Sequence, residues 1–288
     1  MKFLSKENLD IGQEIKSGLY VISTPIGNLE DITLRAIYIL KNSELILCED
    51  TRTSIKLLRR YNINKTLVPY HKFNERKNLN KVINLIKNNR IVSLISDAGT
   101  PIISDPGTIL IRECVKNKIA LHPIPGPSAV TSALSISGFE DKFLFYGFLP
   151  NTISQIENEI KKLSNFPYTI VFFVSPKKIN KILKILQVFF SDRKIMIAKE
   201  MTKIHESFLR SDMKLLDSSK YNFRGELTIV ISNKFNTKKD LNHLTESVKN
   251  EIKIMLKKYS NKDVVSFISK KEKISKKIVY DYCLKLKK

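Results

Sequence analysis

The stretch Ser93-Leu-Ile-Ser-Asp-Ala-Gly-Thr-Pro-Ile-Ile-Ser-Asp-Pro-Gly107 decides how this chain folds. It overlaps the apolar run Ile91–Ile95, which is typical of a buried strand. A tight, stiff turn follows, because Gly99 permits a backbone conformation closed to other residues and Pro101 and Pro106 fix φ. In open α/β sheets such loops at the carboxyl ends of central strands bind ligands. An ordinary strand-to-helix connection has the same local pattern, so this loop alone does not establish a site.

Three further loops follow apolar strands: Thr24-Pro-Ile-Gly-Asn-Leu29, Glu49-Asp-Thr-Arg52 and Pro125-Gly-Pro-Ser-Ala-Val-Thr-Ser-Ala133. The first contains a single glycine, which excludes a dinucleotide fingerprint and a P-loop. In the last, Ser128 opens a helix of small residues. A helix start presents free N–H groups and a partial positive charge, which suit a carboxylate or a ribose hydroxyl. Four loops of one kind favour a ligand site.

Strands and helices alternate along the chain, which predicts an α/β fold. We expect strands at 19–23, 45–48, from 67, at 91–95, 119–124, from 143, at 168–174, 194–198 and 224–231. Helices are expected at about 32–40, 54–60, 76–88, 107–117, 153–163 and 177–189. Asp31 or Thr33 can cap the first helix. This pattern divides the chain into an α/β domain at 18–149, a second at 150–233 and a tail at 234–288.

Composition bounds the class of protein. The 288 residues are enough for two α/β domains, and 42% hydrophobic with 27% charged residues is typical of a soluble globular protein. No run approaches the roughly 20 apolar residues that span a bilayer, and the N-terminus lacks an apolar signal core, so we expect a cytoplasmic protein without a membrane partner. Three scattered Cys and four separated His predict neither a disulfide framework nor a metal site.

The net charge of +22 favours a polyanionic partner, most plausibly nucleic acid. The excess is carried largely by Lys beside abundant Asn and Ile, which low-GC genomic bias also produces. Both interpretations remain open at this point.

In the tail, 16 Lys against 6 acidic residues give a net charge of +10, and apolar spacing predicts three short amphipathic helices. An RNA-backbone contact and a solvated Lys-rich bundle both fit this tail, and the local charge excess favours the contact.

Five motifs occur in one order: Thr-Pro-Ile-Gly-Asn-Leu, Glu-Asp-Thr-Arg, Ser-Asp-Ala-Gly-Thr-Pro with Asp-Pro-Gly, Pro-Gly-Pro-Ser-Ala and Gly-Phe-Leu-Pro. Together they resemble the ribosomal small subunit methyltransferase I family, within the tetrapyrrole methylase superfamily, over residues 18 to 232. The resemblance implies two α/β domains with a cleft between them for S-adenosylmethionine, and a small helix-turn-helix-like appendage at the C-terminal end. It also implies 2′-O-methylation of a cytidine in the decoding region of 16S rRNA, which is either naked RNA or part of the 30S subunit. The same resemblance implies that the enzyme is a homodimer.

The resemblance places the methyl donor against the turn backbones and apolar side chains that surround the cleft. The candidate cofactor-binding residues are Pro25, Asp97, Ala98, Gly99, Thr100, Ile102, Ser128, Ala129, Phe148, Leu227 and Thr228. Methyl transfer from a sulfonium to a ribose hydroxyl requires alignment and loss of a proton from a weak acid. We take Glu49, Asp50, Glu200 and Lys203 as candidate catalytic residues, and Arg35 and Arg52 as candidate RNA contacts, although salt bridges explain each equally well.

Two departures from the family pattern matter. Val174-Ser-Pro-Lys-Lys178 lacks the Glu and Arg usual around Ser-Pro, and the stretch after Pro150 lacks the usual basic residues.

Ordinary loop chemistry is the favoured interpretation of His71, Asn74 and Glu75. A small-molecule methylase of the tetrapyrrole type and a non-catalytic RNA-binding protein remain alternatives. The basic tail and Glu-Asp-Thr-Arg argue against the first, and donor binding would exclude the second.

Overall fold

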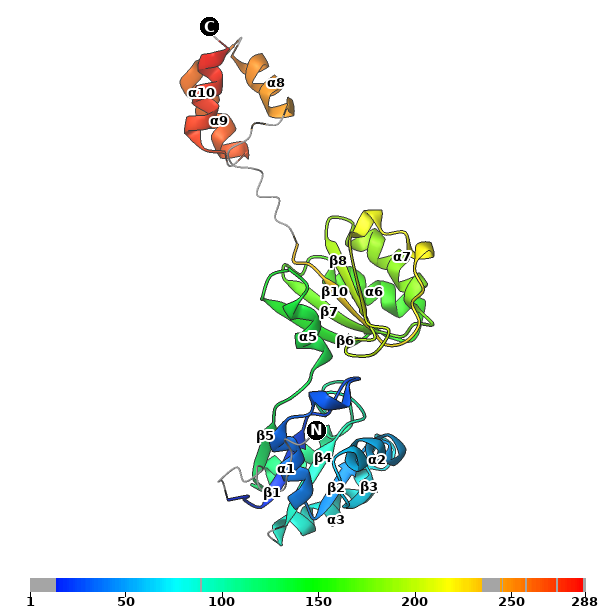
Figure 1. Ribbon diagram of the computed structural model, residues 1–288. Coiled ribbons are helices and arrows are strands. Elements are labelled where there is room, and N and C mark those ends of the chain that lie inside the picture. The colour runs from blue at the N-terminus through cyan, green and yellow to red at the C-terminus, as the bar shows by residue number, and fades with distance from the viewer. Residues whose placement is uncertain are drawn as a thin grey trace. The chain divides into compact units, whose positions relative to one another are not determined.

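The computed structural model describes residues 14–88, 90–234, 244, 246–256, 258–272 and 274–286 (Figure 1). The chain folds into two compact units, one ending at Asn233 and one beginning at Lys234. Among the described residues, the first unit contains two five-stranded sheets with the helices that pack on them, and the second unit contains three helices. Each unit has its own apolar core.

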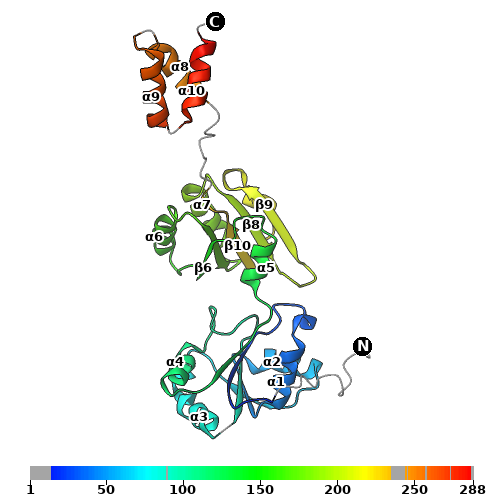
Figure 2. The same cartoon turned by 90° about the vertical axis from the view of Figure 1, so that its left-hand side faces the viewer.

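The first sheet is entirely parallel, with strand order β3-β2-β4-β1-β5. Its strands are β1 (Gly18–Ile22), β2 (Leu45–Cys48), β3 (Thr66–Pro69), β4 (Ile91–Ile95) and β5 (Leu121–Ile124). Helices α1 (Leu34–Asn42) and α2 (Thr51–Arg60) cover one face, and α3 (Glu75–Lys87) and α4 (Thr108–Lys116) cover the other (Figure 2). Because all five strands run in one direction, their carboxyl ends meet at one edge, where the loops of interest begin.

The second sheet is mixed, with strand order β6-β7-β10-β8-β9. Its strands are β6 (Phe143–Phe148), β7 (Thr169–Val174), β8 (Lys194–Lys199), β9 (Ser207–Asp212) and β10 (Leu227–Ile231). Only β6 and β7 are parallel. Helices α6 (Ile153–Leu163) and α7 (Ile179–Phe189) pack on one face and α5 (Ala129–Ser135) on the other. Two short 3₁₀ turns, Met213–Leu215 and Ser218–Lys220, lead into β10, and a third, Leu29–Asp31, precedes α1.

The chain crosses from one sheet to the other between β5 and α5. Sequence reasoning places α5 and β6 with the first sheet, since they lie before residue 150. In the structure, Val130 and Ala133 of α5 pack against Val171, Met196 and Val230 of the second sheet. The first sheet therefore ends at β5, and the loop before Ser128 joins the two sheets.

Capping residues fix where the helices begin. Of the two expected caps for α1, Thr33 is the one used, because its Oγ1 accepts a hydrogen bond from the Ala36 N–H at 3.1 Å. Asp50 caps α2 in the same way, accepting from the Arg52 N–H at 2.8 Å. The buried Glu75 carboxylate reaches from α3 to the start of α4 and accepts from the Ile109 N–H at 2.9 Å. Glu75, for which ordinary loop chemistry was the favoured interpretation, thus links the first residue of α3 to the start of α4.

The second unit contains α8 (Glu246–Met255), α9 (Asn261–Glu272) and α10 (Lys276–Lys285). Within the part of the tail that the structure describes, three helices are found, the number expected from the apolar spacing. Their shared core includes Ile252, Val264, Ile268, Val279 and Cys283. Ile254 and Phe267 belong to the same sequence pattern but are more than half exposed. Residues 235–243, 245, 257, 273, 287 and 288, also part of the expected tail, lie outside the described residues.

Candidate active site

Three loops from the carboxyl edge of the first sheet are joined directly to one another. Thr24 and Gly99 exchange two backbone hydrogen bonds, each of 2.9 Å, and form an isolated antiparallel bridge. The Ser23 and Thr100 hydroxyls lie 2.9 Å apart. A Cβ added to Gly126 would lie 3.0 Å from the Ser23 Cβ, so the Pro125 loop also passes against this pair. The loops containing residues 25, 99 and 128 therefore converge at one place.

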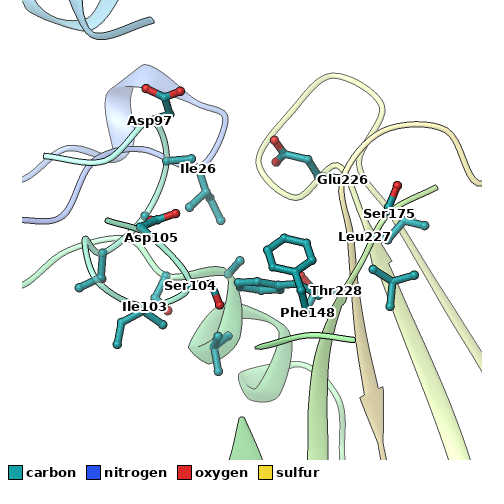
Figure 3. A pocket seen from close by; sticks show the side chains of 18 of the residues that line it. Ile26, Asp97, Ile103, Ser104, Asp105, Phe148, Ser175, Glu226, Leu227 and Thr228 are labelled. Atoms are coloured by element: carbon teal, nitrogen blue, oxygen red, sulfur yellow. The ribbon is translucent and has the colours of Figure 1, made fainter. Parts of the chain in front are cut away.

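The convergent loops line a cavity of about 390 Å³, which the second sheet completes. Figure 3 shows Ile26, Asp97 and Asp105 on one side and Ser175, Glu226 and Leu227 on the other, with Phe148 and Thr228 between them. Nine of the eleven candidate cofactor residues line it: Asp97, Ala98, Gly99, Thr100, Ser128, Ala129, Phe148, Leu227 and Thr228. Pro25 and Ile102 do not, but their neighbours Ile26 and Ile103 do. The sequence thus identifies the loops better than the single positions within them.

The loop after β4 holds an unusual backbone. Gly99 has φ +77°, and so does Ile102, while Ser104 has φ +73°. Positive φ is costly for residues other than glycine and persists only where the surrounding structure enforces it. Here the bridge to Thr24 fixes one end of the loop. Two residues with positive φ thus flank Ile103, which lines the cavity together with Ser104.

Carboxylates gather where the first sheet meets the cavity. Burial, together with the charge of Glu49, raises the pKa of Asp105 to about 6. Burial also raises the pKa of Glu49, and the charge of nearby Asp97 adds to the effect. Asp105 lines the cavity whereas Glu49 does not. Asp105 is absent from the sequence-based candidates, although its place between Ser104 and Pro106 in a strand-end loop was the signal that could have selected it.

Asp50 and Arg52 form an ion pair with each other. The Arg52 guanidinium forms an ion pair of 2.6 Å with the Asp50 carboxylate, and this contact lowers the pKa of Asp50 to about 2. The Asp50 N–H donates to Asp97 Oδ1 at 3.1 Å, which ties the loop after β2 to the loop after β4. The Asp50 carboxylate therefore caps a helix and pairs with a cation, while most of the Arg52 side chain remains exposed.

Glu200 and Lys203 form an ion-pair network beside the cavity. Lys203 Nζ lies 3.0 Å from Glu200 Oε1 and 3.0 Å from Glu226 Oε2. Burial lowers the pKa of Lys203, but its hydrogen bonds to Glu200 and Glu226 outweigh burial and raise it. A lysine held in this way stays charged at neutral pH, so its chemistry is that of a cation that holds an anion.

The same network joins the two halves of the first unit. The Asn28 N–H donates to Thr202 Oγ1 at 3.0 Å. A Cβ on Gly27 would lie 2.5 Å from Lys203 Cγ and 2.9 Å from the Met201 carbonyl oxygen. Gly27 is therefore required for close approach between the first loop and the turn after β8. Gly27, Asn28, Thr202 and Lys203 line a second hollow of about 740 Å³ next to this contact.

Arg35 is not brought to the main cavity. It lines a separate hollow of about 480 Å³ with Tyr20, Tyr38 and His122. The departures from the family pattern do reach the cavity, since Val174, Ser175 and Pro176 line it. Lys178 instead donates to the Asn151 carbonyl oxygen at 3.1 Å.

Neither a metal centre nor a membrane span is found among the residues that the structure describes. In that part of the chain, no group of three or more His, Cys, Asp or Glu side chains is placed to hold a metal ion. Nor does any helix there combine the length and apolar character needed to cross a membrane.

The fold matches that of solved structures at low sequence identity. The structure resembles the methyltransferase CobJ with a TM-score of 0.57 and 16% identity, covering 75% of this chain and 94% of that one. It resembles diphthine synthase with a TM-score of 0.59 and 14% identity, covering 74% and 89%. A family model described as Tetrapyrrole (Corrin/Porphyrin) Methylases matches residues 18–217. The chain therefore belongs to the tetrapyrrole methylase family.

Curated relatives define the branch of this family. A protein of Rickettsia prowazekii is 43% identical over 221 residues, covering 76% of this chain and 79% of that protein. One of Thermotoga maritima is 42% identical over 219 residues, covering 75% and 98%. One of Buchnera aphidicola is 36% identical over 274 residues, covering 93% and 96%. All three carry the name Ribosomal RNA small subunit methyltransferase I, and the family resemblance found in the motifs is confirmed.

Proposed function

We propose that this chain transfers a methyl group from S-adenosylmethionine to the 2′-hydroxyl of a cytidine in the decoding region of 16S rRNA. The observation that carries the proposal is the convergence of the Thr24, Gly99 and Ser128 loops with Leu227 and Thr228 around one cavity. Its volume of about 390 Å³ falls in the range of roughly 300–1,000 Å³ typical of small-molecule sites. The names of the curated relatives support an rRNA substrate.

The residues present fit a donor of this chemistry. Ile26, Ile103, Phe148 and Leu227 supply apolar walls for a flat ring. Asp97, Asp105 and Glu226 supply negative charge at the cavity, which favours a cationic sulfonium and an amino group. When bound, the donor supplies an activated methyl group and leaves as a neutral thioether. The protein then has to align the acceptor hydroxyl and accept its proton.

Asp105 is the group best placed to accept that proton. It lies in the cavity wall, it is half-buried, and its pKa of about 6 is closer to neutrality than that of an ordinary carboxylate. A base whose pKa lies near the working pH is ionised yet retains proton affinity. Asp50 is a weaker base because Arg52 holds it ionised, and Lys203 is held protonated by two carboxylates.

The decisive experiment supplies 30S subunits from a strain that lacks this methylation. The purified protein is incubated with S-adenosylmethionine and either 30S subunits, isolated 16S rRNA or a tetrapyrrole, and the methylated position is mapped. We expect methylation of one cytidine ribose, and the comparison of 30S with isolated RNA identifies the working substrate. Methylation of a base, or of the tetrapyrrole alone, would contradict the proposal.

Donor binding is measured separately by calorimetric titration. A protein without measurable affinity for S-adenosylmethionine would be an RNA-binding protein rather than an enzyme. Sedimentation analysis of the same sample tests the homodimer that the family resemblance implies.

A further inference from the structure

One aromatic side chain, Phe73, stands fully in solvent on the loop that follows β3, at the carboxyl edge of the first sheet. Phe73 is 98% exposed, the highest value among the large apolar side chains of the described residues. In the free protein, a phenylalanine at such a position contributes no hydrophobic stabilisation, because none of its apolar surface is removed from water. Full exposure is therefore consistent with a ligand that would cover the ring.

The loop that carries Phe73 is held firmly. The Asn74 side chain accepts from the His71 N–H at 2.8 Å and donates to the Pro69 carbonyl oxygen at 2.9 Å. The Tyr70 N–H donates to the Cys48 carbonyl oxygen at 2.7 Å, which fixes the loop to β2. On the inner side, the His71 ring packs edge-on against Phe73 with centroids 6.0 Å apart. The ring is thus presented from a structured support, so a ligand would not have to order the loop.

Charge around the ring is divided into two zones. Lys72, Arg76 and Lys77 are exposed next to Phe73. No ion pair joins any of the three to a carboxylate in the part of the chain that the structure describes. On the cavity side, the charge of Lys72 acts on the carboxylates of Glu49 and Asp105. The Phe73 loop therefore carries exposed cations, and one of them, Lys72, lies close enough to Glu49 and Asp105 for its charge to act on both.

This arrangement matches one nucleotide of a single strand. Phosphates favour the Lys72–Arg76–Lys77 side and are repelled by the cavity carboxylates. Every base has a flat face that stacks on an aromatic ring without requiring a particular sequence. Resting on the proposed function, we propose that Phe73 is a stacking platform for an unpaired base of the RNA substrate, next to the nucleotide that enters the cavity, with Lys72, Arg76 and Lys77 contacting its backbone.

The chain contains no tryptophan, so a single one reports on this position alone. Phe73→Trp keeps an aromatic face, and Val188→Trp, at a position of α7 that is 72% exposed, is the matched control. The probes are a 12-nucleotide single-stranded RNA of mixed sequence and an abasic chain of the same length. We expect the RNA to quench the emission of Phe73→Trp, the abasic chain to leave it unchanged, and neither probe to affect Val188→Trp.

Three results of this titration overturn the platform. The first is equal quenching by the abasic chain, and the second is no quenching by the RNA when anisotropy shows that it binds. The third is emission that depends on protein concentration without RNA, since a second copy of the chain would then cover the ring.

Kinetics separates the platform from the proposed function. Phe73→Ala should raise the KM for methyl transfer to 30S subunits by roughly 5- to 100-fold and leave donor affinity and kcat unchanged. Phe73→Tyr should restore the KM. If the unaltered protein transfers methyl groups and Phe73→Ala has the same KM, the platform is excluded and the function stands. If the unaltered protein transfers none while RNA still quenches Phe73→Trp, the function is excluded and the platform stands.

Discussion

Asp105 lies half-buried in the cavity wall and carries a raised pKa of about 6. If it accepts the proton of the acceptor hydroxyl, only its ionised form is active. The rate of methyl transfer should then rise about tenfold per pH unit up to about pH 6 and level off above it. Asp105→Asn should lower the rate by roughly 10²- to 10⁴-fold and abolish the pH dependence. Single-turnover methyl transfer between pH 5 and pH 8 measures both. A parallel fall in donor affinity would instead indicate a binding role.

The same side chain predicts a change in stability. Folding raises the Asp105 pKa from 3.8 to about 6, so the folded protein binds the proton more tightly than the unfolded chain. Stability therefore decreases as the pH rises through this window, and the full cost is present above about pH 6. Asp105→Asn should be more stable than the unaltered protein by up to about 2–3 kcal/mol at pH 7, and the difference should vanish below pH 4. Urea denaturation at both pH values tests the sign.

Gly27 shows what a single methyl group would disturb. Gly27→Ala would bring Cβ to 2.9 Å from the Met201 carbonyl oxygen, which is backbone and cannot move aside cheaply. We expect a loss of about 1–3 kcal/mol in stability and weaker donor binding, because the first loop would move away from the turn after β8. Thermal unfolding and donor titration measure the two effects. Gly138→Ala is the control, since its Cβ would meet nothing within 4 Å and only the strain at φ +72° remains. Unchanged donor affinity in Gly27→Ala would show that this contact does not shape the cavity.

At the scale of helices and strands, most of the first unit follows from sequence patterns. Apolar runs identify β4 and β7, and apolar spacing identifies α6 with the observed bounds. The edge strand β9 is missed because Ser207–Asp212 is polar and only partly buried, so it lacks the alternation of a core strand. The assignment of α5 and β6 to the second sheet also escapes local reasoning. It depends on contacts between Val130 and strands far along the chain.

The link between α3 and α4 rests on one buried carboxylate. Glu75 is 4% exposed and accepts from the Ile109 N–H at 2.9 Å and the Leu110 N–H at 3.4 Å, which otherwise begin α4 without partners. Glu75→Ala should lose about 1–3 kcal/mol of stability, because two donors and a cavity are left behind. Glu75→Gln keeps an acceptor oxygen and should lose less. Urea denaturation of both variants measures the difference, and equal losses would show that the volume rather than the hydrogen bonds of Glu75 matters.

At the scale of the whole molecule, the charge of +22 has two explanations, RNA binding and genomic bias. Lys276 and Lys277 are exposed in the first turn of α10. The helix dipole disfavours cations there, so local stability does not explain these lysines. If the lysines reflect only genomic bias, the position of Lys276 and Lys277 has no effect on RNA binding. If they contact the RNA backbone, removing them from this position weakens RNA binding.

Paired substitutions test this difference. Lys276→Gln with Lys277→Gln should weaken 16S rRNA binding and reduce the slope of log affinity against log salt concentration by about 0.7–0.9 for each phosphate that the protein no longer neutralises. Stability should stay the same or increase, because two unfavourable charges leave the helix start. Lys181→Gln with Lys184→Gln, on exposed positions of α7, removes the same charge from the first unit and is the control. Filter binding from 50 to 300 mM salt measures all three proteins. Identical slopes for the two pairs would mean that only net charge matters, and genomic bias would then be the better explanation of the lysine-rich tail.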